Sequence, residues 1–265
     1  MQSLWSREPQ RGHVEEEGTM TQAIRSFVLV TKWELLSLKS ILPFIVVIQL
    51  IIAGGTVYGL GYLFPQIDPL SAKYIVTGAV TMTLIALGLT LAPQHIAQMK
   101  EKGTFDYLWS LPVPRLVFLA SDFVVWTAVA APGVVAALVI GSHRYDFALD
   151  PRGSIVPAFL LVALTSVTLG MSIAHLSPSP MFTGILTNVI VFSLFLFSPV
   201  NFPAERLPEW LQSVHRVLPI VYMADLVRGT ATSGLTDHVA RAAAVVGVWC
   251  AASTAALLAV FTRRS

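Results

Sequence analysis

Six apolar runs of roughly 20 residues constrain this chain more than any other feature, because each is long enough to cross a hydrocarbon core of about 30 Å as an α-helix. They lie at about 41–64, 74–93, 116–141, 155–176, 181–199 and 239–261. Hydrophobic residues make up 55% of the chain and charged residues 12%, about half the charged share of a soluble domain. The sequence therefore predicts an all-α polytopic membrane protein with six transmembrane helices.

The segment before the first run has two parts. Residues 1–20 are polar and lack the apolar core of a signal peptide; we expect disorder there, with Met20 as an alternative start of translation. Residues 21–39 combine apolar positions at helical spacing with a basic stripe at Arg25, Lys32 and Lys39. This pattern predicts an amphipathic helix on an anionic membrane surface, or alternatively a surface helix packed on a soluble partner. Residues 21–265 are expected to form one domain.

The distribution of lysine and arginine near the span ends predicts the orientation. Eight lie on one side of the membrane and three in the short loops on the other. The eight are Arg25, Lys32, Lys39, Lys100, Lys102, Arg115, Arg263 and Arg264, and the three are Lys73, Arg144 and Arg152. Both termini are therefore expected to be cytoplasmic, together with the segment between the second and third spans.

That cytoplasmic segment, Glu101–Arg115, is a polar and aromatic interruption between two apolar runs. Thr104 is a suitable N-cap for a short helix that would end near Leu111, before Pro112 and Pro114. A short helix with charged residues at one end suits docking into a cleft on a cytoplasmic protein. The alternative is an interfacial helix that only turns the chain.

The segment between the fifth and sixth spans is long and half apolar. Leu207–Arg216 and Val221–Arg228 each have the pattern of a short amphipathic helix, and Gly229 is the expected C-cap of the second. Pieces of this length do not span a bilayer, so we expect re-entrant or interfacial helices on the extracytoplasmic side.

The polar residues do not form a catalytic pattern. The six histidines have no metal-ligand spacing, and no Ser/His or Glu/His pair favours a membrane hydrolase. Asp122 is the one acid within a span, and predicts either a substrate or partner contact or an interfacial acid paired with a nearby base. Asn188 in the fifth span favours a helix–helix hydrogen bond, with ligand contact as the alternative.

Two motifs resemble those of type 2 ABC transporter permeases. Lys100–Asp106 (KEKGTFD) with Leu111–Arg115 (LPVPR) resembles the family's cytoplasmic signature before the third span. Phe202-Pro203, Leu207–Leu211 (LPEWL) and Tyr222–Gly229 (YMADLVRG) resemble its segment between spans five and six. The resemblance covers about residues 21–261, although relatives more often carry a basic or small residue at position 122.

This resemblance implies a permease subunit of an ABC exporter in a bacterial plasma membrane, moving an amphipathic drug, antibiotic or lipid. Two separate ATPase subunits would drive it, beside a second permease copy or a sister permease. The chain has no Walker A, signature or Walker B sequence, so ATP and Mg are expected on the partner, with no cofactor and no enzyme activity on this chain. Membrane lipids are expected partners and nucleic acid is not.

The resemblance also implies residue roles. Coupling to the ATPase is expected at Glu101, Gly103, Thr104, Phe105, Asp106, Leu108 and Arg115. The candidate translocation path comprises Asp122, Asn188, Phe192 and Phe195. Two alternatives remain for function: export of a polysaccharide or lipid-linked glycan, and a non-transporting membrane anchor of an ATPase complex.

Overall fold

A computed structural model describes residues 11–63, 67–111, 113–146, 153–232, 235–236 and 238–263. Every regular element in these residues is a helix, which confirms the predicted fold class. The elements in chain order are α1 (Arg11–Leu38), α2 (Leu42–Leu63), α3 (Pro69–Ala86), the π turn η1 (Leu87–Leu91), α4 (Ala92–Glu101), α5 (Thr104–Trp109), α6 (Arg115–Tyr145), α7 (Ile155–Leu176), α8 (Pro180–Phe197), the 3-10 turn η2 (Ala204–Arg206), α9 (Glu209–His215), α10 (Pro219–Ala231) and α11 (Val239–Arg263).

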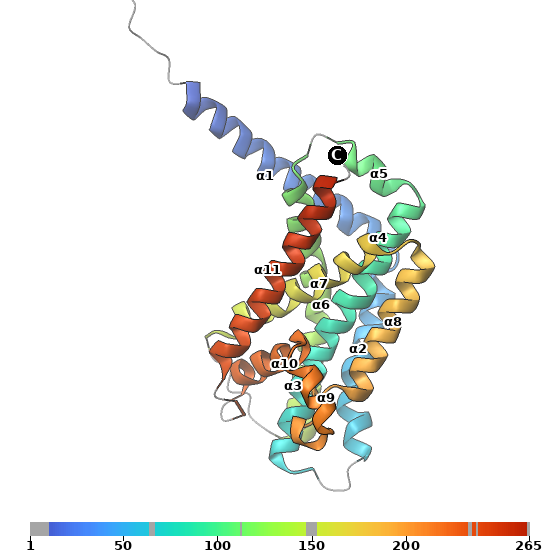
Figure 1. Ribbon diagram of the computed structural model, residues 1–265, viewed down its shortest axis with the longest axis vertical. Helices are drawn as coiled ribbons and strands as arrows, with labels where there is room; N and C mark the ends of the chain where they lie inside the picture. Colours follow the sequence, from blue (N-terminus) through green and yellow to red (C-terminus); the bar gives the residue numbers. More distant parts are fainter. Residues whose placement is uncertain are drawn as a thin grey trace, which may run out of the picture.

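Six segments within these helices are long and apolar enough to cross a membrane. They are Leu42–Tyr62, Pro69–Glu101, Arg115–Tyr145, Ile155–Leu176, Pro180–Phe197 and Val239–Val260. The second of them is the most enclosed by the rest of the protein, and its first part, α3, packs against α2, α6, α7 and α10. The other spans surround this central helix (Figure 1).

The second span continues well past the predicted end at Pro93. Proline has no N–H and its ring clashes with the carbonyl four residues earlier, so it normally ends or kinks a helix. Here η1 immediately precedes α4, and Pro93 lies in the first turn of α4. A π turn changes the hydrogen-bond register from i→i+4 to i→i+5, and the helix thereby continues to Glu101.

Helix α1 begins at Arg11, whereas we expected disorder up to residue 20. The first part of the segment predicted to be disordered, residues 1–10, lies outside the described residues. No proline lies between Arg11 and Leu38, so nothing in the backbone stops the helix from extending toward the N-terminus. The N-terminal part of α1 projects away from the bundle (Figure 1), while the hydroxyl of Thr31 lies 3.2 Å from that of Ser121 on α6.

The two short helices between the fifth and sixth spans are present as α9 and α10, toward the opposite end of the bundle from α5 (Figure 1). The predicted C-cap at Gly229 is wrong, because α10 continues to Ala231 and Thr232 caps it in an extended conformation. Gly229 instead allows a close approach: a Cβ there would overlap the side chain of Val239 at the start of α11.

Candidate functional site

Helix α5 begins after a left-handed residue. Gly103 has φ 70° and occupies the N-cap, so the predicted N-cap Thr104 is instead the first helical residue. Glycine adopts positive φ without steric penalty, and this conformation lets the chain turn from α4 into α5. Asp106 lies in the first turn, where its negative charge is favourable to the helix dipole. The helix ends at Trp109, before the predicted end at Leu111.

The predicted coupling residues divide into an inner and an outer set. Phe105 packs edge-on against His175 of α7 with ring centroids 5.3 Å apart, and Leu108 is buried. Lys100 donates a hydrogen bond to the Ala174 carbonyl at 2.8 Å and lies over the Phe105 ring. These contacts hold α5 against the end of α7.

The outer set faces away from the bundle. Glu101, Gly103 and Asp106 are exposed, and Tyr107 is 66% exposed. Thr104 and Arg115 are partly buried at the two ends of the α5 segment. The helix is therefore anchored by its apolar residues and presents a charged and aromatic surface that the described rest of this chain does not cover.

A small cavity of about 40 Å³ lies beneath α5, and two carboxyl groups, those of Glu34 and Asp122, line it. Glu34 of α1 is 3% exposed and lines this cavity together with Asp122 of α6. Burial, and secondly the charge of Asp122, raises the pKa of Glu34 well above its usual range. One of our two predictions for Asp122 was pairing with a nearby base. In the structure its neighbour in this cavity is instead an acid, Glu34.

A second cavity, a groove of about 420 Å³, brings together the other three predicted path residues. Asn188, Phe192 and Phe195 line it from α8, opposite residues of α2, α3 and η1. Phe192 is 67% exposed, and the remaining lining is mostly apolar, with polar atoms from Gln49, Thr83 and Thr90. Asp122 does not line this groove. The arrangement suits an amphipathic molecule with a large apolar surface.

Gln49 was not predicted, although it is the only amide in an otherwise apolar first span. Its Nε2 donates to the Val129 carbonyl at 2.7 Å, and its Oε1 accepts from the Gly133 N–H at 3.1 Å. Pro132 lies between these two residues within α6. Proline lacks an N–H and displaces the preceding turn, so Gln49 supplies hydrogen bonds to backbone groups beside the disturbed turn. The signal in the sequence was an amide in one span and a proline in another.

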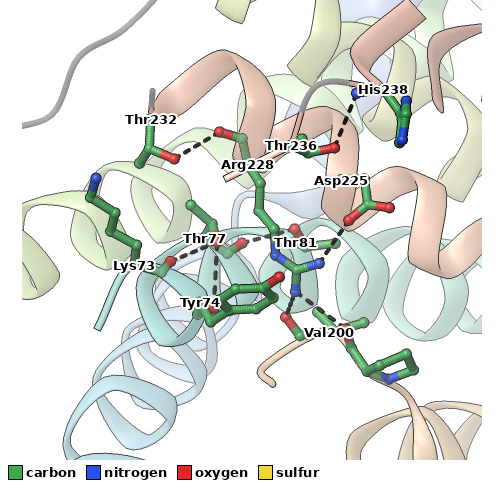
Figure 2. A network of polar contacts seen from close by, with 11 residues as sticks. Lys73, Tyr74, Thr77, Thr81, Val200, Asp225, Arg228, Thr232, Thr236 and His238 are labelled. Carbon is green, nitrogen blue, oxygen red and sulfur yellow. Dashed lines mark hydrogen bonds and ion pairs between the residues drawn. The ribbon is translucent and has the colours of Figure 1, made fainter. Parts of the chain in front are cut away.

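Arg228 holds the segment after α8 against α10 and α3. Figure 2 shows its guanidinium between Asp225, the Val200 carbonyl and the Tyr74 ring. The Nη1 atom donates to Asp225 Oδ1 at 2.9 Å, Nη2 donates to the carbonyls of Pro199 and Val200, and the guanidinium lies 4.4 Å from the Tyr74 ring centroid. Arg228 is only 2% exposed, so its charge is compensated almost entirely within the protein.

The comparisons with known proteins agree with this architecture. The family model described as ABC-2 type transporter matches residues 25–231, which is most of the chain. The chain belongs to the ABC-2 type transporter family. The matched region includes α5, both carboxyls of the buried pair, the groove and α10. It is therefore a multi-pass transporter subunit of this family.

Three relatives of this transporter subunit are Nodulation protein J from different rhizobial species. The chain is 24% identical to Nodulation protein J of Neorhizobium galegae over 64% of this chain and 66% of that protein. It is 23% identical to Nodulation protein J of Rhizobium leguminosarum bv. viciae over 72% and 74%, and 24% identical to that of Rhizobium meliloti over 74% and 75%. The matches thus span about two thirds to three quarters of these relatives. No solved structure matches the chain significantly.

Proposed function

We propose that this transporter subunit is the permease of an ABC exporter, and that the groove between α2, η1 and α8 carries an amphipathic small molecule such as a drug, antibiotic or lipid. Two ATPase subunits would bind ATP and Mg and dock on α5, beside a second permease copy or a sister permease. The protein would lie in a bacterial plasma membrane with both termini cytoplasmic.

The observation that carries the proposal is a continuous line of packing from the exposed face of α5 to the groove. Phe105 of α5 contacts His175 at the end of α7. Farther along α7, Gly170 lies so close to η1 that a Cβ on Gly170 would overlap the Gly88 carbonyl oxygen. Neighbouring residues of the same turn, Leu87 and Thr90, line the groove.

Close packing makes this line suitable for transmitting a displacement. Backbone contact at Gly88 and Gly170 leaves no flexible side chain between α7 and η1, so movement of α7 is expected to displace the π turn directly. A π turn within a span is also a common location for functional rearrangement. ATP-driven movement of a partner at α5 would then change the shape of the groove.

Reconstitution with the ATPase tests the proposal. Inside-out vesicles containing both proteins are expected to accumulate a fluorescent amphipathic dye upon ATP addition. Charge reversal in Glu101→Lys or Asp106→Lys should abolish ATP-dependent uptake and weaken co-purification of the ATPase, because both residues are exposed, Glu101 at the end of α4 and Asp106 on α5.

Glu205→Lys is a matched control, since Glu205 is also exposed but lies in η2 rather than on α5. It should leave ATPase binding unchanged. Normal ATPase binding and normal uptake in both Glu101→Lys and Asp106→Lys would refute the assigned coupling surface. Absence of ATP-driven uptake for every amphipathic dye would refute the proposed cargo class.

A further inference from the structure

A third cavity, of about 450 Å³, lies among α9, α10 and the start of α11, away from both α5 and the groove. Its polar lining is unusually basic. The cavity is lined by Pro199, Ala204, Gln212, His215, Arg216, Val221, Tyr222, Asp225, His238, Arg241 and Ala242. Among the described residues, the cavity is thus lined by two arginines, two histidines and one acid.

The charges of this cavity are not balanced within the described part of the chain. Asp225 is its one carboxylate, and Oδ1 of that residue is already bonded to Arg228. Arg216 and Arg241 are exposed, and no ion pair is formed by either among the described residues. Two guanidinium groups on one cavity, whose one described carboxylate is already paired with Arg228, favour an anion.

His215 provides a second, independent indication of a ligand. It is 6% exposed, and its Nε2 lies 3.0 Å from the Phe197 carbonyl oxygen. A carbonyl only accepts, so Nε2 carries the hydrogen. The other ring nitrogen, Nδ1, is buried without a hydrogen-bond partner in the structure. Buried polar atoms are normally paired. Since Nδ1 then only accepts, a ligand group that keeps an acidic O–H, such as a phosphate monoester, would pair it by donating.

The other lining residues indicate what the ligand carries besides its acidic group. Its remaining wall includes the apolar side chains of Val221, Ala204 and Ala242. The Tyr222 hydroxyl donates to the Arg216 carbonyl at 2.9 Å, which ties α9 to α10 and holds the backbone of one arginine in place. A site lined by both basic groups and small apolar residues suits an anionic head attached to an apolar body.

We propose that this cavity binds the phosphate monoester group of an amphipathic anion, with Arg216 and Arg241 as the anion ligands. The proposal rests only on the residues that line this cavity, so it is independent of the transport direction and of the cargo. Membrane phospholipid headgroups and free anions share this chemistry. The assay therefore has to separate them.

Calorimetric titration of the purified protein in uncharged detergent distinguishes these sources. The probes are dihexanoyl phosphatidic acid, dihexanoyl phosphatidylcholine and inorganic phosphate. We expect saturable binding of phosphatidic acid and at least tenfold weaker binding of phosphatidylcholine. Phosphate as tight as phosphatidic acid would support the anion site and assign it to the headgroup alone. Weaker phosphate would add the apolar wall to the site.

Arginine variants decide whether this cavity is responsible. Arg216→Gln and Arg241→Gln should each weaken phosphatidic acid binding roughly tenfold or more, because each removes a charge-assisted hydrogen bond. Arg241→Lys should retain part of the affinity. The control is Arg206→Gln, an exposed arginine in η2 that lies outside the cavity lining.

Circular dichroism and thermal unfolding establish that each variant is folded. Equal affinity for phosphatidic acid and phosphatidylcholine would overturn the proposal. So would folded Arg216→Gln and Arg241→Gln variants that bind phosphatidic acid like the unsubstituted protein or like Arg206→Gln.

Discussion

Replacing Gln49 by methionine should destabilise the bundle measurably, because it removes two buried hydrogen bonds while keeping the side-chain volume. Both bonds go to the backbone of α6 on either side of Pro132, at 2.7 and 3.1 Å. Gln49 is fully buried, so water does not replace it. Hydrogen bonds between membrane helices average about 0.6 kcal/mol and reach about 1.7 kcal/mol. The two bonds together therefore contribute about 1–3 kcal/mol.

Thermal unfolding in detergent measures this loss. At roughly 2–4 °C per kcal/mol for a chain of this size, Gln49→Met should lower Tm by about 2–12 °C. Ile48→Met is the matched control: Ile48 is the neighbouring residue, lines the same groove and makes no side-chain hydrogen bond. It should change Tm much less than Gln49→Met does.

A double-mutant cycle tests the assigned cause. In a Pro132→Ala background α6 regains a backbone N–H at position 132, so Gln49→Met should then cost less than in the unsubstituted protein. If Gln49→Met leaves Tm unchanged, α6 closes its own hydrogen bonds beside Pro132. The amide would then not stabilise the kink, and the reasoning would be wrong.

Three further changes test other parts of the structure. Because the pKa of Glu34 is raised in the folded protein, its contribution to stability is full below its usual pKa and is lost as pH rises through the folded value. Glu34→Gln should flatten the decline of Tm between pH 4 and 8, whereas an unchanged slope would exclude the Glu34–Asp122 pair as its source. Gly170→Ala should overlap the Gly88 carbonyl and sharply reduce the yield of folded protein by size-exclusion chromatography, while Gly184→Ala, with open space at its Cβ, should not. Arg228→Met leaves Asp225 and two carbonyls unpaired and should lower the free energy of unfolding by about 3 kcal/mol in a reversible denaturant titration; a loss below 0.5 kcal/mol would contradict the network in Figure 2.

Local sequence patterns determined the helices of this protein. The six spans, α5 and the α9–α10 pair follow from apolar run lengths, prolines and short amphipathic periods, all of which act within one or two turns. The errors were also local. Gly103 rather than Thr104 occupies the N-cap of α5, and α10 continues through Gly229. In both cases the glycine serves a feature that capping patterns do not identify. Gly103 allows the turn between α4 and α5, and Gly229 allows close contact with α11.

Only the tertiary structure decided which polar groups meet. Glu34 and Asp122 are 88 residues apart in the chain, and Gln49 reaches across 80 and 84 residues to α6. The groove likewise joins three helices from different parts of the chain, and leaves Asp122 outside. Periodicity predicts which face of a helix is polar or apolar, but the azimuth of one helix against another is set by packing of side chains and by close glycine contacts such as Gly88 with Gly170. The sequence by itself therefore determined the helices and their order, whereas packing decided their contacts and cavities.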